Sequence, residues 1–200
     1  MNKILIGCKS GWQFPKRRER CLRTWMQALP FYRDRVDAVF TFGVRELPRP
    51  ERQGCCLFLP APNAYHFLPQ RMRWFCEWAY WLEWPWDYLW CMDDDTRLSL
   101  PRLLAYDTAG ADYIGPEWKP GVGYASGGGC FLSRRAVAIV AEKLTHVEGA
   151  DDQLVGEVLR AAGIQLKIDN EHFKVFAELD DKPGPDNEWV YATPKVRELE

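Results

Sequence analysis

Short apolar segments alternate with segments of helical periodicity along the 200 residues of this chain. Apolar runs bounded by polar or glycine-rich stretches predict strands at 3–8, 36–42, 55–59, 88–92, 112–115, 130–132 and 165–168. Helical patterns occupy 17–29, 68–84, the residues after 99 and after 133, and 151–163. This alternation is typical of an α/β fold with a mixed, mostly parallel sheet flanked by helices. We therefore expect one domain over 1–200, with the polar tail 182–200 loosely ordered.

Charge, hydropathy and cysteine usage argue against several classes of function. The formal net charge is -2 and the pI is about 6.0, whereas nucleic acid or an anionic membrane surface requires a clustered basic face. No apolar run approaches the length of a membrane span, and the opening MNKILIGCKSGW is too short for a secretory segment. The seven cysteines include no Cys-x-x-Cys pair, so neither a disulfide framework nor a zinc site is indicated. We expect a cytoplasmic protein without a membrane span.

An apolar strand over 88–92 runs directly into three consecutive carboxylates, Asp93, Asp94 and Asp95. Adjacent carboxylates repel one another and are costly to desolvate, so the cluster calls for a compensating charge unless it is only a solvated turn at the surface. Ligands of α/β sheets bind beyond the carboxyl ends of strands, which favours the first alternative. Oxygen ligands suit Mg²⁺ or Mn²⁺, which commonly bind together with substrate phosphates. The cluster therefore predicts a site for a metal-bound diphosphate.

Other phosphate-binding patterns are absent from the sequence. The run Gly127, Gly128 and Gly129 lacks the Gly-x-x-x-x-Gly-Lys pattern of a P-loop, and no Gly-x-Gly-x-x-Gly follows the first strand. Nucleotide triphosphatase and dinucleotide-dependent redox functions therefore lose support. The glycine run is either a flexible loop or a place where a ligand approaches the backbone closely, and both interpretations stay open.

Four segments resemble, in the same order, motifs of glycosyltransferase family 31, the β-1,3-galactosyltransferase and Fringe-like group. They are RERCLRTW (18–25), WCMDDDTRL (90–98), YASGGGCFLSR (124–134) and GADDQLVGEVLRAAGI (149–164), and NAYHFLPQRM (63–72) is a weaker match to a fifth. The resemblance implies the GT-A fold and a metal-dependent, inverting transfer of a hexose or N-acetylhexosamine. The donor would be a UDP-sugar, the acceptor a hydroxyl of a glycan or glycoconjugate, and the cofactor Mn²⁺ or Mg²⁺. A member without a membrane anchor suggests a microbial or viral origin.

The resemblance also implies roles for the acidic residues. Asp95 would be the principal metal ligand, and Asp93 and Asp94 would contact metal, ribose or sugar. Asp152 would take the proton of the acceptor hydroxyl, with Asp151 as the alternative base. Carboxylates are also favoured at a helix N-terminus by the helix dipole, so capping alone is the competing interpretation of this pair. His172 takes the place of a histidine that completes the metal shell, unless it is simply a surface or core histidine.

The remaining candidates concern substrate binding. Gly127 and Gly128 would let the donor sugar and acceptor approach the backbone. The residues assigned either to the diphosphate or to fold stability are Arg17, Arg23 and Arg71. Trp118 and Tyr124 are candidates for stacking on an acceptor sugar, with core packing as the alternative.

Two other functions fit the same residues. One is another nucleotide-sugar enzyme of GT-A fold, either a retaining transferase or a nucleotidyltransferase. The other is a non-catalytic sugar-binding module, against which the two retained acidic clusters argue, because they are electrostatically costly without a function. The identity of the UDP-sugar and of the acceptor is not encoded in any motif.

Overall fold

A computed structural model describes residues 2–177 and 191–194, and for 174–177 and 191–194 it describes the backbone alone. The larger sheet has the strand order β3-β4-β2-β1-β5-β8-β7-β9. Its strands are β1 (Ile4–Lys9), β2 (Val36–Gly43), β3 (Glu51–Gln53), β4 (Cys56–Leu59), β5 (Tyr88–Asp93), β7 (Tyr113–Gly115), β8 (Cys130–Ser133) and β9 (Lys167–Ile168). The central strands β4, β2, β1 and β5 pair in parallel, whereas β8 pairs antiparallel with both β5 and β7. The predicted mixed, mostly parallel sheet is therefore confirmed.

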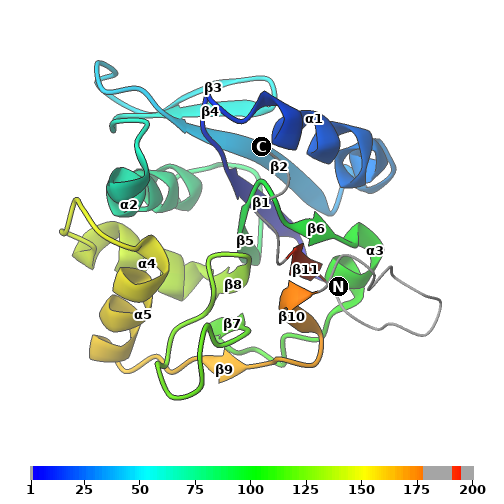
Figure 1. The fold of residues 1–200 in the computed structure, drawn as a ribbon, viewed down its shortest axis with the longest axis vertical. Helices are drawn as coiled ribbons and strands as arrows, with labels where there is room; N and C mark the ends of the chain where they lie inside the picture. Colours follow the sequence, from blue (N-terminus) through cyan, green and yellow to red (C-terminus); the bar gives the residue numbers. More distant parts are fainter. Residues whose placement is uncertain (1, 178–190, 195–200) are drawn as a thin grey trace.

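Helices cover both faces of this sheet. Figure 1 shows α2 (Leu68–Tyr80), α4 (Arg134–Lys143) and α5 (Asp151–Ala161) on one face, and α1 (Pro15–Arg23) and α3 (Leu100–Ala105) on the other. The 3₁₀ helix η1 (Trp25–Tyr32) follows α1, and η2 (Tyr65–Phe67) precedes α2. A smaller sheet joins β10 (Phe173–Ala177), β11 (Tyr191–Pro194) and β6 (Arg97–Leu98) beside α3.

The strand β1 explains why the core has two halves. Its alternate residues point to opposite faces, so Ile4 and Ile6 pack in the cluster beneath α1 and α3 while Leu5 packs in the cluster beneath α2 and α4. A strand buried on both faces reads as a continuous apolar run, which is why the sequence identifies it. Gly7 permits close packing of α2, because a β-carbon there would lie 2.1 Å from Cε1 of Phe75.

Several predicted boundaries were wrong. The expected helix over 17–29 begins earlier, at Pro15, and ends at Arg23, because Thr24 leaves the helical conformation with φ -114° and ψ -107°. The chain then continues as η1 through Pro30, which buries Trp25 and Met26 in the core. The helix expected over 68–84 ends at Tyr80. The strands expected at 55–59, 112–115 and 165–168 are shorter, and β3, β6, β10 and β11 were not predicted.

Other local predictions are confirmed. Ser133 caps α4, since its side chain accepts a hydrogen bond from the backbone N–H of Ala136 at 3.2 Å. The helix α5 begins at Asp151, and Gly163 follows it with φ +81°, as expected for a C-terminal glycine. The tail 182–200 lies outside the described residues except for the backbone of β11.

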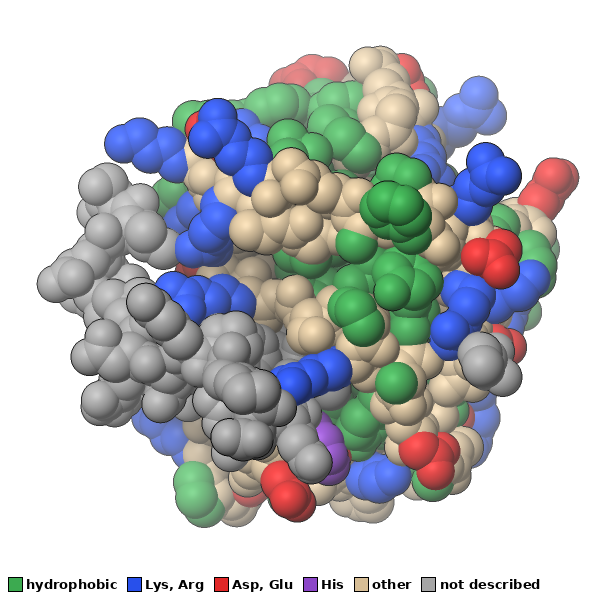
Figure 2. Space-filling view, turned by 90° about the vertical axis from the view of Figure 1, so that its right-hand side faces the viewer, with side chains coloured by type: hydrophobic (Ala, Val, Ile, Leu, Met, Phe, Trp, Pro, Cys, Tyr) green, Lys and Arg blue, Asp and Glu red, His purple; other side chains and the backbone are tan. Residues whose placement is uncertain are grey.

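The surface is mixed in charge where it is visible. Figure 2 shows basic and acidic side chains interspersed with apolar and polar ones on one face of the molecule. Within the described ranges, no helix is long and apolar enough to cross a membrane.

Candidate active site

The carboxyl ends of β1 and β5 bring together groups that are far apart in the sequence. The two strands pair in parallel with Lys9 opposite Asp93, so their ends meet at one edge of the sheet. The Nζ of Lys9 lies 3.1 Å from Oδ1 of Asp93 and 2.9 Å from Oδ2 of Asp151, at the start of α5. The Lys9 and Asp151 side chains are only 12% and 9% exposed. This lysine therefore joins the two acidic clusters that the sequence singles out.

The other two carboxylates of the triplet have a second cation. Asp94 is buried and its Oδ2 accepts a 2.6 Å hydrogen bond from Oγ of Ser10. The Nη1 of Arg17, on α1, lies 3.2 Å from Oδ2 of Asp95 and 3.6 Å from Oδ1 of Asp94. Lys9 and Arg17 thus compensate much of the negative charge of the triplet, for which the sequence analysis expected a metal ion.

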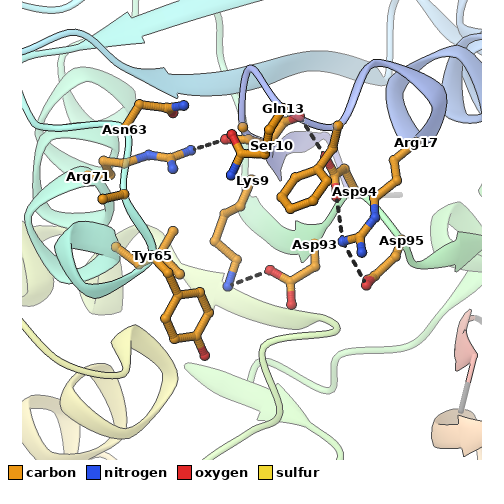
Figure 3. Close-up of a pocket in the computed structure, with 14 residues that line it drawn as sticks. Lys9, Ser10, Gln13, Arg17, Asn63, Tyr65, Arg71, Asp93, Asp94 and Asp95 are labelled. Atoms are coloured by element: carbon orange, nitrogen blue, oxygen red, sulfur yellow. Dashed lines mark hydrogen bonds and ion pairs between the residues drawn. The ribbon is translucent and has the colours of Figure 1, made fainter. Parts of the chain in front are cut away.

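These groups line a cavity of about 230 Å³, which we call the central cavity. Figure 3 shows that side chains from the end of β1, from α1, from the segment around η2 and from the end of β5 surround it. Its polar or charged lining residues are Lys9, Ser10, Gln13, Arg17, Asn63, Tyr65, Arg71, Asp93, Asp94 and Asp95. A cavity with cationic and anionic groups at strand ends has the chemistry of a phosphate and cation site.

The triplet retains one group that can accept a metal ion. The Oδ1 atom of Asp95 is buried and has no hydrogen-bond partner. No group of three or more His, Cys, Asp or Glu side chains in the described part of the chain is arranged to hold a metal by itself. Mg²⁺ and Mn²⁺ need only one or two carboxylates when substrate phosphates complete the shell. Asp95 and the neighbouring Asp93 therefore fit a cation that arrives with a diphosphate.

The first glycine of the glycine run lies against the acidic groups. A β-carbon on Gly127 would lie 3.2 Å from Oδ2 of Asp93, 3.4 Å from Nζ of Lys9 and 3.7 Å from Oδ2 of Asp152. A second cavity, of about 20 Å³, borders Gly127, Lys9 and both carboxylates of α5. Gly127 is therefore closely surrounded by charged side chains of the protein itself, and the approach of a ligand to its backbone stays a prediction. Gly128 is held by the loop, since its carbonyl accepts a 2.9 Å hydrogen bond from Oγ1 of Thr96.

Burial and charge shift the proton affinities of these groups in a consistent way. Although 39% of the Asp93 side chain is exposed, partial burial raises its pKa to about 7, with Lys9 opposing the rise and Asp151 adding to it. Burial also raises the pKa of Asp152, again with Asp151 adding and Lys9 opposing. Burial lowers the pKa of Lys9, but Asp151 and Asp93 outweigh it and raise that pKa well above its ordinary value. Lys9 is therefore charged, and Asp152 is a stronger base than an ordinary aspartate.

The three predicted arginines are in different environments. Arg17 contacts the triplet as described above. Arg71 lines the cavity but is buried, donates to the backbone carbonyls of Ser10 and Thr41 at 2.7 and 2.6 Å, and has its pKa lowered by burial to about 10. Arg23 is not brought to the cavity, because its side chain is 74% exposed and pairs with Glu19 one turn away on α1.

The predicted histidine and aromatic residues do not line the central cavity. His172 does not line the central cavity, and its Nδ1 lies 2.9 Å from Oδ2 of Asp169. Trp118 and Tyr124 share a loop in which the Trp118 N–H donates to the Tyr124 carbonyl at 3.3 Å. Tyr124 packs against α5 at Gly156, where an added β-carbon would lie 2.4 Å from the Cβ of Tyr124. Burial raises the pKa of Tyr124, and the negative charge of Asp152 adds to this shift.

Sequence reasoning gave no role to Lys9, Ser10 or Tyr65. The first two directly follow the buried part of β1, so the same strand-end rule that selected Asp93 could have selected them. Tyr65 lines the cavity from the segment before α2, and the charges of Asp151, Asp152 and Asp93 contribute to raising its pKa after burial. No local pattern places this tyrosine beside the carboxylates.

The chain has a mixed α/β fold with an eight-stranded sheet flanked by helices, and comparison with solved structures confirms the predicted GT-A fold. One similar structure is a glycosyltransferase involved in the glycosylation of the major capsid of PBCV-1. It has a TM-score of 0.61 and 12% identity over 96% of this chain and 93% of its own. Another is the catalytic domain of Drosophila β1,4-galactosyltransferase 7 in complex with xylobiose, with a TM-score of 0.52 and 15% identity. That match covers 83% of this chain and 64% of the Drosophila chain.

These likenesses concern the fold. No family model matches the chain, and no curated protein matches it in sequence. The resemblance to glycosyltransferase family 31 therefore stays a prediction.

Proposed function

We propose that this chain is a glycosyltransferase that moves a hexose or N-acetylhexosamine from a UDP-sugar to a hydroxyl of a glycan acceptor, with inversion. The observation that carries the proposal is the convergence of Asp93, Gly127 and Asp152 around Lys9. On one side of this arrangement lies the central cavity, whose charged lining suits a diphosphate with its cation. On the other side lies Asp152, whose pKa is raised. The fold shared with two solved glycosyltransferase structures supports the same reading.

The residues of the central cavity would bind the donor. Arg17 lies within reach of a diphosphate because it already borders the cavity beside Asp95. Asp95 and Asp93 would hold Mn²⁺ or Mg²⁺ through carboxylate oxygens. When bound, the cation would neutralise part of the diphosphate charge and so make UDP a better leaving group.

Asp152 would act as the general base. Both carboxylates border the small cavity, but Asp151 is committed to the ion pair with Lys9, whereas Asp152 accepts a 2.8 Å hydrogen bond from the N–H of Gln153. As the acceptor oxygen bonds to the anomeric carbon, its proton passes to Asp152. The bond from that carbon to the diphosphate oxygen breaks, and UDP leaves with the electron pair. Gly127 leaves room for this exchange because it has no side chain.

The donor site is tested by titrating UDP into the protein with Mn²⁺ and again with EDTA, for the wild type and Asp95→Ala. We expect binding that needs both the cation and Asp95. Absence of UDP binding in every condition would refute the proposed donor class. Glu19→Ala, at an exposed acidic position on α1, is the matched control and should bind as the wild type does.

The base is tested in a UDP-sugar and acceptor screen with Asp152→Asn. We expect turnover to fall by about 10² to 10⁴, the usual contribution of general-base catalysis, with UDP binding retained. The matched control is Glu157→Gln, which removes an exposed carboxylate from the same helix. Near-normal turnover in Asp152→Asn would remove this base and favour a retaining transferase or a nucleotidyltransferase. UDP binding without any transfer would favour a non-catalytic binding module.

A further inference from the structure

A second surface of the chain has the composition of a ligand site. At the C-terminal end of α2, a groove of about 430 Å³ is lined by three tryptophans, Trp78, Trp81 and Trp84. Its charged lining residues are Arg49, Glu77 and Glu83. We call this surface the tryptophan groove. Its volume falls within the range of small-molecule sites.

The groove is separate from the central cavity. Leu68, at the start of α2, lines the central cavity, whereas Trp81 directly follows the last residue of this helix. At 1.5 Å per residue along α2, Leu68 and Trp81 are about 20 Å apart, and the nearest lining residues on this helix, Arg71 and Glu77, are about 9 Å apart. A ligand of the groove would not occupy the donor site.

Two of the three tryptophans are held in place by the core, and the third exposes its ring to solvent. Trp78 and Trp84 are partly buried and pack against the core cluster beneath α2, while the side chain of Trp81 is 76% exposed. Exposing an indole to water is unfavourable, and several such rings around one concave surface usually mark a contact site. Because two of the three rings are anchored in the core, the groove is shaped before any ligand arrives.

The polar groups of the groove indicate which ligand would fit. Among the described residues, the side chains of Arg49, Glu77 and Glu83 have no hydrogen-bond or ion-pair partner, so their donors and acceptors are available. Two carboxylates against one guanidinium disfavour an anionic ligand, including an anionic lipid surface. A neutral polyol satisfies both signs, since its hydroxyls donate to carboxylates and accept from arginine.

We propose that the tryptophan groove binds a pyranose glycan. The apolar C–H face of a sugar ring would pack on Trp81, and its hydroxyls would hydrogen-bond to Glu77, Glu83 and Arg49. In a glycosyltransferase such a site would hold part of a longer acceptor, at the opposite end of α2 from Leu68, which lines the central cavity. The binding itself does not depend on transfer activity.

The test is a titration of the full chain, without UDP or cation, with cellobiose, chitobiose and N-acetyllactosamine, followed by ligand-observed NMR. We expect at least one disaccharide to give a saturable signal with a Kd of about 1 mM. Trp81→Ala and Glu77→Gln should each weaken it about tenfold or more. Trp81 is exposed and Glu77 is partly exposed at the C-terminal end of α2, and thermal unfolding will check that the variants are folded.

The matched control is Phe31→Ala, which removes an aromatic ring that is 82% exposed on η1. It should leave the glycan signal unchanged. The proposal is overturned if no disaccharide gives a saturable signal, or if Trp81→Ala binds as the wild type does. It is also overturned if the only Trp81-dependent event is self-association or sedimentation with neutral phosphatidylcholine vesicles. None of these outcomes bears on UDP binding, so failure here and failure of the proposed transferase function are distinguishable.

Discussion

Replacing Lys9 by methionine removes the cation that joins the two acidic clusters in the described part of the chain, while keeping the length and apolar part of the side chain. In the folded protein, Asp151 would then remain almost fully buried without its ion-pair partner. Removing one partner of a buried ion pair costs about 3–5 kcal/mol, because the other charge is left uncompensated. Asp93 adds less to this cost, since its side chain is 39% exposed and water screens its charge. We expect Lys9→Met to lower the free energy of unfolding by about 3 kcal/mol near pH 8.

The loss should depend on pH with a definite sign. The pKa of Asp93 in the folded protein is about 7, above its value of 3.8 in an unfolded chain. The folded state therefore binds this proton more tightly, and the contribution of Asp93 to stability falls as pH rises from about 4 to 7. Without Lys9 the pKa of Asp93 rises further, because Lys9 opposes the shift. The difference between the variant and the wild type should therefore be larger at pH 8 than at pH 5.

Urea unfolding at the two pH values measures this difference, with an unchanged m-value as the check that only stability has changed. Lys16→Met removes an exposed lysine on α1 and should change stability by less than about 0.5 kcal/mol. The double variant Lys9→Met with Asp151→Asn should recover part of the loss, because the uncompensated carboxylate is gone. A loss below about 1 kcal/mol at pH 8, or no recovery in the double variant, would refute the view that Lys9 holds these carboxylates together.

Three further predictions follow from contacts at the site and in the core. Gly127→Ala places a methyl group 3.2 Å from Oδ2 of Asp93, so turnover should fall at least about tenfold, or 1.4 kcal/mol in the barrier, while the melting temperature changes little. Steady-state kinetics and a thermal scan of the same sample check both parts, and unchanged turnover would contradict them. Gly7→Ala would put a β-carbon 2.1 Å from Phe75, and overpacking of this kind should lower the free energy of unfolding by about 1–3 kcal/mol in urea titrations. The third prediction concerns the pH profile of turnover. Activity should rise with pH as Asp152 loses its proton, and the midpoint of this rise should lie above the ordinary pKa of an aspartate, because the pKa of Asp152 is raised. The residual activity of Asp152→Asn should not show this rise with pH. If the rise persists in the variant, a group other than Asp152 causes it.

The local elements of the fold could be read from the sequence because they depend on neighbours along the chain. Apolar runs predicted β1 and β5, and the serine at 133 and the glycine at 163 predicted where helices begin and end. The same reading failed at the helix expected over 17–29, where Thr24 turns the chain and burial of Trp25 takes precedence over helical propensity. It also missed β3, β6, β10 and β11; β3 contains no apolar residue and β6 has only two residues, so no apolar run marks either of them.

The candidate site divides in the same way. The sequence by itself determined that Asp93 follows a buried strand and that Asp151 and Asp152 open a helix, because periodicity and helix signals are local. Only the tertiary structure decided that Lys9 joins the two acidic clusters, since Lys9 and Asp151 are 142 residues apart. It also decided that Arg17 and not Arg23 meets the triplet, because the rotation of α1 against the sheet sets which arginine points inward. Ion pairs across a sheet edge depend on how strands and helices pack in three dimensions, and that packing leaves no mark on the spacing of residues within any single element.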